Sequence, residues 1–308
     1  MKPGVRFFIL LCTLLLLLPA TTGCTGEKKR EDGLIRVTVT TGMIGDIVEN
    51  VGGKLVSVTT LMGPGVDPHF YKASQGDMEK LADADLVFYN GLHLEGKMVE
   101  IFGKMSKQKP VVAVTDGIDK DLLLKTADNQ YDPHVWFDVK LWMKAVEQVK
   151  STLVKTDPRH KDDYESQAAE YLKELEELDR YVREQLATIP KERRVLVTAH
   201  DAFGYFGRAY DMEVVGLQGI STASEYGLKD VQRLVNLLVD RKIKAVFVES
   251  SVSKRSLEAV VQGARTRNHE VTIGGELFSD AMGKRGTPEG TYIGMVKHNV
   301  NTIVKALR

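Results

Sequence analysis

Residues 157–190 read DPRHKDDYESQAAEYLKELEELDRYVREQLATIP. Asp157-Pro158 is a typical helix start, because Asp is a common N-cap residue and Pro is tolerated in the first turn. Apolar residues then recur every three or four positions, namely Tyr164, Ala168, Tyr171, Leu175, Leu178, Val182, Leu186 and Ile189. Pro190 ends the run, so we predict one helix of roughly 45 Å at about 1.5 Å per residue. Charges interrupt the stripe and no heptad repeat is sustained, which favours a stiff connector over a coiled coil.

On both sides of this helix, short apolar segments alternate with helical patterns. Strands are predicted at 35–41, 56–62, 86–90, 111–115, 194–199, 214–217, 245–249 and 270–273. Helices are predicted at 44–51, 75–82, 92–107, 202–210, 228–241, 254–268 and 295–307, and Asp138 can cap one more. This alternation is typical of parallel sheets covered on both faces. We therefore expect an α/β protein with an N-terminal lobe at 34–156, the connecting helix at 157–189 and a C-terminal lobe at 190–308, each lobe with a mostly parallel sheet of about four strands.

The chain begins with a targeting segment. Lys2 and Arg6 precede an apolar run at 7–18, and a short polar end follows at 19–23. The run is too short to span a bilayer as a stable helix, so 1–23 is interpreted as a signal peptide. Cys24 follows Gly23 directly, which favours lipid attachment at Cys24 and a charged tether at 24–33. Ordinary cleavage near Gly23, which would leave a free soluble protein, is the alternative.

Composition excludes some classes of protein. Removing residues 1–23 takes two of the 42 basic residues and none of the 42 acidic ones, which leaves a net charge near −2. This balance gives no footprint for nucleic acid. Cys24 is the one cysteine beyond the apolar run, so no disulfide holds the mature fold.

Two Asp-Pro-His turns stand out among the seven histidines. They lie at Asp67-Pro68-His69 and Asp132-Pro133-His134. Proline fixes its own φ and restricts the preceding residue, so each His is placed by a stiff backbone. An Asp-Pro turn beside a chance His would explain one copy, but two copies favour a shared site.

A third His and an Asp complete the predicted site. Ligands in open parallel sheets bind beyond the carboxyl ends of the strands. His69, His134, His200 and Asp280 all follow predicted strands, two in each lobe. Three imidazoles and a carboxylate suit a borderline divalent ion such as Zn(II) or Mn(II), bound once per chain.

Other residues compete for these roles. Glu276 is the alternative to Asp280 as the carboxylate ligand. His93 also follows a strand, but a helix start there favours a role in capping that helix or in contacting a ligand from behind. Glu249 ends a strand and is a candidate partner of a ligand. Asp201 is expected to cap the next helix. His160, His269 and His298 are interpreted as surface residues.

The chain resembles the TroA-like, cluster A-I binding lipoproteins of bacterial ABC importers for zinc and manganese, from Leu34 to the C-terminus. The motifs that carry the resemblance are GPGVDPH at 63–69, NGLHLE at 90–95, DPHVWFD at 132–138, VTAHDAF at 197–203 and GGELFSDAMG at 274–283. The resemblance implies two lobes joined by one rigid helix, metal ligands at the four residues named above, and delivery of the ion to a membrane permease driven by a cytoplasmic ATPase. It also implies an extracytoplasmic protein held at the membrane by its lipid, and we expect a monomer.

Two features bear on the choice of metal within this resemblance. Zinc-dedicated relatives often carry a histidine-rich loop before the second Asp-Pro-His, whereas residues 117–131 contain no His. Some manganese-dedicated relatives have Glu where this chain has His200. The chain is therefore similar to the branch that takes both metals.

Two other functions compete with transport binding. A zinc hydrolase usually keeps one open metal position for water and a general base nearby, whereas four protein ligands close the site. A surface adhesin would require an exposed sticky patch, and no stretch indicates one. We therefore expect a binding protein and not an enzyme.

Overall fold

The computed structural model describes residues 33–126 and 128–308. The predicted signal peptide, Cys24 and nearly all of the tether lie outside these residues. Among the described residues, no helix combines the length and apolar character that crossing a membrane requires.

Eight strands form two sheets in which every neighbouring pair is parallel. The first sheet has the order β2-β1-β3-β4 and the second the order β6-β5-β7-β8. The strands are β1 Ile35–Val39, β2 Val56–Thr60, β3 Leu86–Tyr89, β4 Val111–Ala113, β5 Val195–His200, β6 Glu213–Gln218, β7 Ala245–Glu249 and β8 Thr272–Leu277. The prediction of two lobes with four-stranded parallel sheets is confirmed, and we use N-terminal lobe for the β1–β4 half and C-terminal lobe for the β5–β8 half.

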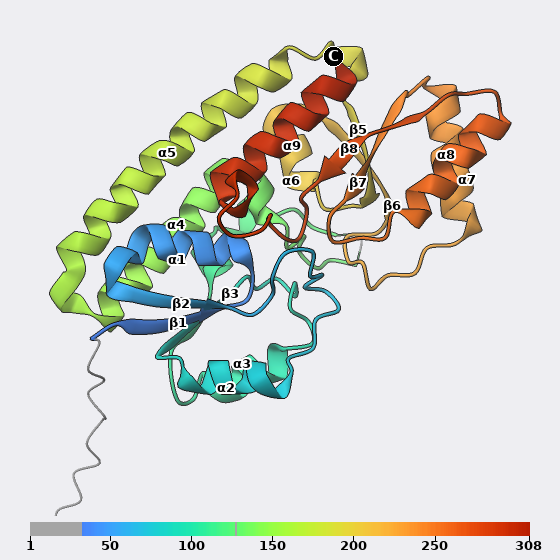
Figure 1. The fold of residues 1–308 in the computed structure, drawn as a ribbon. Helices are drawn as coiled ribbons and strands as arrows, with labels where there is room; N and C mark the ends of the chain where they lie inside the picture. Colours follow the sequence, from blue (N-terminus) through green and yellow to red (C-terminus); the bar gives the residue numbers. More distant parts are fainter. Residues whose placement is uncertain (1–32, 127) are drawn as a thin grey trace, which may run out of the picture. The chain divides into compact units, whose positions relative to one another are not determined.

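Nine α-helices of the described chain flank these sheets. They are α1 Gly42–Gly52, α2 Gln75–Asp83, α3 Val99–Met105, α4 Val139–Thr156, α5 Lys161–Ala187, α6 Gly204–Tyr210, α7 Leu228–Asp240, α8 Arg255–Thr266 and α9 Tyr292–Leu307. Short 3-10 helices lie at Gly53–Leu55, Val114–Gly117, Lys120–Leu122, Val135–Phe137, Pro158–His160, Lys191–Arg193 and Pro288–Gly290. In Figure 1, α1 and α4 lie on one face of the first sheet and α2 and α3 on the other, while α7 and α8 lie on the outer side of the second sheet.

The long helix α5 has 27 residues, and a 3-10 turn at Pro158–His160 precedes it. All eight residues of the predicted apolar stripe are buried. Asp157 does not cap the helix through its side chain. Its carboxylate instead contacts the ring Nδ1 of His160 at 2.6 Å, because the 3-10 turn brings that ring back over Asp157. Figure 1 shows α5 running past α1 and α4 and then past α9.

One buried apolar cluster extends through both lobes. It includes Val37 and Phe88 of the first sheet, Leu178 of α5, and Phe247 and Ile303 of the C-terminal lobe. Two smaller clusters lie under α2 and α3 and under α7 and α8. Because close-packed interiors resist deformation, this shared core opposes large movement between the lobes.

The predicted helix at 92–107 is wrong in its first half. Gly91, Leu92 and His93 have φ values of 89°, 52° and 64°, which no α-helix contains, and α3 begins only at Val99. The buried Glu95 carboxylate accepts hydrogen bonds from the backbone N–H groups of Asn90 and Gly91 at 2.7 and 3.3 Å. These bonds fold NGLHLE into a tight loop, so His93 does not start a helix.

Candidate metal centre

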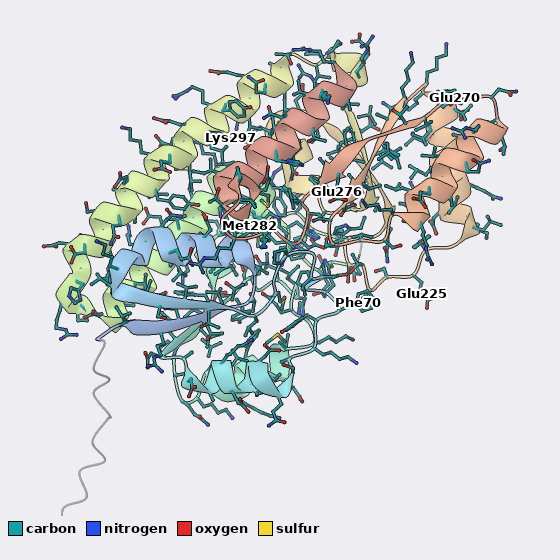
Figure 2. The ribbon with its side chains drawn as sticks, in the orientation of Figure 1. Phe70, Glu225, Glu270, Glu276, Met282 and Lys297 are labelled. Atoms are coloured by element: carbon teal, nitrogen blue, oxygen red, sulfur yellow. The ribbon has the colours of Figure 1, made fainter. Side chains whose placement is uncertain are left out.

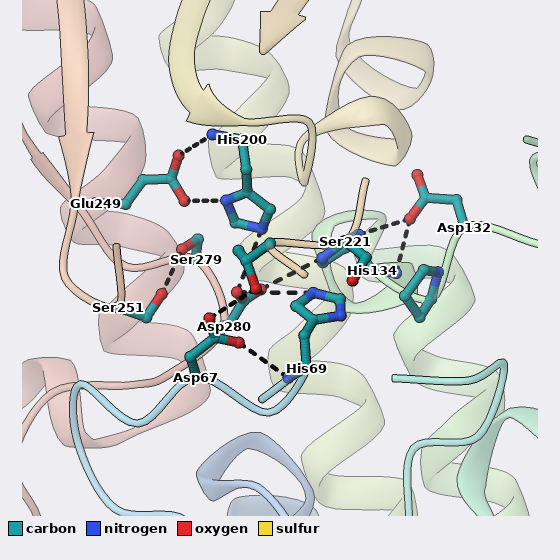
Figure 3. A network of polar contacts seen from close by, with 12 residues as sticks. Asp67, His69, Asp132, His134, His200, Ser221, Glu249, Ser251, Ser279 and Asp280 are labelled. Atoms are coloured by element: carbon teal, nitrogen blue, oxygen red, sulfur yellow. Dashed lines mark hydrogen bonds and ion pairs between the residues drawn. The ribbon is translucent and has the colours of Figure 1, made fainter. Parts of the chain in front are cut away.

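The four predicted ligands converge at the carboxyl edges of the two sheets. His69 lies on the loop between β2 and α2, and His134 on the segment before α4. His200 is the last residue of β5, and Asp280 follows β8. One ligand atom from each residue lies within 4.8 Å of the others, and all four residues are buried. Figure 3 shows these side chains directed toward one another.

Asp280 lies at the centre of the cluster. Its Oδ2 lies 3.2 Å from Nε2 of His200 and 3.9 Å from Nε2 of His69, and its Oδ1 lies 3.3 Å from Nε2 of His134. The three Nε2 atoms and both Asp280 oxygens are buried and make no well-formed hydrogen bond. Buried polar atoms without such partners are costly. A divalent cation bound between them satisfies all of these atoms, so the residues fit a metal ion.

His134 is oriented by Asp132 of its own motif. Oδ1 of Asp132 accepts hydrogen bonds from the backbone N–H of His134 at 2.9 Å and from its ring Nδ1 at 2.7 Å. Because an ionised carboxylate only accepts, Nδ1 keeps its proton, and Nε2 is the ring atom that faces the cluster and can bind an ion once it is deprotonated. Sequence reasoning treated Asp132 as a turn residue, although the Asp-x-His spacing was the signal for this contact.

His200 is oriented by Glu249, which the sequence indicated as a candidate partner of an unspecified ligand. Oε1 of Glu249 accepts a hydrogen bond from the backbone N–H of His200 at 2.9 Å, and Oε2 lies 2.5 Å from its Nδ1. Both residues are fully buried. Asp132 and Glu249 therefore each contact the backbone and the ring of one histidine, from opposite lobes, and the ring contact has hydrogen-bond geometry at His134 but not at His200.

His69 differs from the other two histidines. Asp67 accepts a hydrogen bond from its backbone N–H at 2.9 Å, but within the described chain no carboxylate contacts its Nδ1. The other oxygen of Asp67 accepts a hydrogen bond from the Thr222 hydroxyl, in the C-terminal lobe, at 2.7 Å. Thr222 was not singled out from the sequence, since no local pattern indicates a contact 155 residues away.

The charges of the cluster are strongly coupled. Burial raises the pKa of Asp280, but the neighbouring His200 and His134 outweigh it and hold that pKa well below its ordinary value. Burial lowers the pKa of His134, but the carboxylates of Asp132 and Asp280 have the larger opposite effect. The net result is that the pKa of His134 is raised to about 9. For His69, burial dominates and lowers the pKa to about 3. His69 is therefore ready to donate its lone pair, while His134 must release a proton to bind a cation.

The remaining candidates lie outside the cluster. The last strand, β8, ends later than predicted and includes Glu276 (Figure 2). The exposed carboxylate of Glu276 pairs with Lys254 at 2.6 Å, so it is directed away from the cluster. His93 is exposed and lines a cavity of about 460 Å³ that His69 also lines. Asp201 does not cap α6, which begins at Gly204 without a side-chain cap. His160, His269 and His298 contact Asp157, Ile243 and Glu276 respectively.

Residues 37–306 match the family described as ZnuA, zinc-uptake complex component A, periplasmic. The chain belongs to this family. It is 53% identical over 311 residues to the manganese-binding lipoprotein MntA of Bacillus subtilis (strain 168), with 100% of both chains covered. It is 50% identical over 301 residues to the zinc-binding protein TroA of Treponema pallidum (strain Nichols), covering 96% of this chain and 98% of TroA.

Solved structures of the ZnuA family share the fold. The periplasmic zinc-binding protein TroA from Treponema pallidum superposes with a TM-score of 0.88 at 51% identity, covering 89% of this chain and 99% of that chain. At this identity the same two-sheet arrangement and long helix are expected in both proteins. The resemblance inferred from the motifs is thereby confirmed.

Proposed function

We propose that this protein captures one Zn(II) or Mn(II) ion between its lobes, outside the cytoplasm, and delivers it to the membrane permease of an ABC importer with a cytoplasmic ATPase. His69, His134, His200 and Asp280 are the proposed ligands. The observation that carries the proposal is the convergence of four buried ligand atoms within 4.8 Å of one another. The printed names of the relatives, a manganese-binding and a zinc-binding protein, support the choice of cargo.

The proposal includes how the chain is organised. Residues 34–156 and 190–308 form the lobes, 157–189 connects them, 1–23 is a removed signal peptide, and a lipid on Cys24 anchors a monomer. Naming of relatives as lipoproteins supports the anchor. Four protein ligands leave no position for an activated water, which argues against hydrolysis, and a capture protein requires no catalytic residue.

Metal preference follows from the ligand set. Three imidazoles and one carboxylate suit tetrahedral Zn(II), and Mn(II) lies at the weak end of the usual affinity order. If Asp280 binds through both oxygens, the coordination number rises, which helps Mn(II). We therefore expect the purified protein to hold zinc more tightly and still to bind manganese.

Competition titration tests both the function and the preference. The metal-free protein is titrated with Zn(II) and Mn(II) at equal free concentration, and bound metal is counted by elemental analysis. One ion per chain, mostly zinc, is the expected result. Absence of stoichiometric binding of either ion would contradict the proposed function, and a preference for manganese would show that the site geometry overrides the affinity order.

A further inference from the structure

Near His134 and Asp280, the two lobes are joined by several buried hydrogen bonds. The indole Nε1 of Trp136 donates to the carbonyl of Ser279 at 3.0 Å, and the Tyr292 hydroxyl donates to the carbonyl of Trp136 at 2.6 Å. The Tyr205 hydroxyl donates to the carbonyl of Asp132 at 2.9 Å. Since Ser279 precedes Asp280 and Asp132 orients His134, these bonds hold two of the four ligands together across the lobes.

The loop that carries His69, residues 61–74, is joined to the C-terminal lobe much more sparsely. Among the residues that the structure describes, one hydrogen bond links this loop to that lobe, from the Thr222 hydroxyl to Oδ2 of Asp67. Oδ1 of the same carboxylate accepts from the backbone N–H of His69 (Figure 3). One side chain therefore connects the C-terminal lobe to the position of His69.

His69 is also the ligand least tied to its neighbours. Its Nε2 lies 3.9 Å from Asp280, against 3.2 and 3.3 Å for the other two histidines. It has no carboxylate at Nδ1 within the described chain, unlike His134 and His200.

The loop after β6, residues 219–227, provides the other half of this contact. Thr222 is buried with 6% of its surface exposed. Its neighbours Gly219, Ile220, Ser221 and Ser224 line the 460 Å³ cavity that reaches His69. Separation of the two loops would therefore release His69 and widen a cavity that already extends to the site.

We propose that Asp67 and Thr222 form a latch that sets how fast the bound ion leaves, and that His69 is the first ligand withdrawn. This inference rests on the proposed function, because it assigns a release route to the same site. Asp67 and Thr222 are positioning residues: they touch no ion and act by fixing the His69 loop against the C-terminal lobe.

Release kinetics test the latch. Protein loaded with Zn(II) is mixed with excess fluorescent zinc chelator, and the release rate is measured by stopped flow for wild type, Thr222→Val, Thr222→Ser and Asp67→Ala. A hydroxyl bound to a carboxylate contributes enough that its loss should speed release about tenfold in Thr222→Val. Asp67→Ala should speed release at least as much, because it also removes the acceptor for the backbone N–H of His69. Thr222→Ser keeps the hydroxyl and should stay within about twofold of wild type. Thr266→Val, which removes an exposed hydroxyl bonded within α8, is the matched control.

The combined variant separates the latch from a general loss of packing. Asp67→Ala with Thr222→Val should release zinc no faster than Asp67→Ala alone, since Asp67→Ala already removes the bond that Thr222→Val breaks. Wild-type release rates in Thr222→Val, or equal acceleration in Thr222→Ser, would overturn the latch while leaving the proposed function intact. A wild-type protein that binds no metal would instead overturn the proposed function itself. Far-ultraviolet circular dichroism of each variant shows whether it is folded.

Discussion

At the scale of single residues, the three histidines of the cluster are held with unequal strength. Asp132 and Glu249 each contact both the backbone and the ring of one histidine. Asp67 contacts only the backbone of His69. Carboxylates that orient a ligand ring also raise its basicity, so His134 and His200 form the fixed part of the site and His69 its adjustable part.

Alanine substitution at each proposed ligand should weaken zinc binding by about 100-fold or more. Loss of a residue that only hydrogen-bonds a metal ligand typically lowers metal affinity by about 10–100-fold, so loss of the ligand itself should lower it at least as much. His93→Ala should have a smaller effect, since His93 is exposed and lies outside the cluster. Isothermal titration of His69→Ala, His134→Ala, His200→Ala and Asp280→Ala measures this, with His298→Ala as the control. Unchanged affinity in His200→Ala would refute the assignment of ligands.

At the scale of elements, the positions of strand ends predicted which four residues lie together, because parallel strands bring their carboxyl ends to one edge. Apolar runs and periodicity predicted all eight strands and the buried stripe of α5. The grouping of His69, His134, His200 and Asp280 followed from that topology, and their role as metal ligands stays a prediction. Asp138 also caps α4 as expected, accepting from the N–H groups of Lys140 and Leu141.

What the sequence did not reveal depends on contacts between distant segments or on one buried side chain. Glu95 replaces a predicted helical turn by binding backbone N–H groups, and periodicity contains no signal for that. Trp136 and Thr222 matter through partners in the other lobe, at separations of 143 and 155 residues. Such contacts follow from how the lobes pack, and that packing is set by the whole core.

Burial of Asp46 between α1 and α5 should make stability depend on pH. Asp46 of α1 is buried, and its Oδ2 accepts a hydrogen bond from the Tyr171 hydroxyl of α5 at 2.5 Å. Burial raises the pKa of Asp46 from 3.8 to about 6. Between these values the folded state holds a proton that the unfolded chain has lost, so this group's contribution falls as pH rises from about 4 to 6 and is flat above.

Asp46→Asn removes this ionisation and keeps an acceptor for Tyr171. The free energy of unfolding of the metal-free variant should exceed that of wild type by about 2 kcal/mol at pH 7.5, and by less at pH 5. Urea denaturation at the two pH values measures the difference. Asp162→Asn, an exposed change on α5, is the matched control. A gain of equal size at both pH values would show that ionisation of Asp46 is not its cause.

At the scale of the whole molecule, the shared core and the 27-residue α5 restrict how the lobes move. Opening the cleft widely would break backbone hydrogen bonds of α5 or slide packed faces past one another. We therefore expect a small closure on metal binding. Small-angle scattering should give nearly the same radius of gyration with and without zinc, and a change comparable to a wide domain rotation would refute the stiff-connector interpretation.

Because the proposed ligands come from four separate segments of both lobes, we expect a bound ion also to affect how long the protein survives outside the cytoplasm. Only the folded chain assembles the site, so an ion at 100 times its dissociation constant adds about 2.7 kcal/mol to folding. When metal is scarce, the empty protein loses this stabilisation, so we expect proteases that attack the unfolded chain to cleave it faster. Pulse proteolysis in partially denaturing urea should degrade the metal-free form far faster than the zinc-loaded form, and equal rates would contradict this. The rate at which the protein is degraded would then depend on how much metal is available for it to bind.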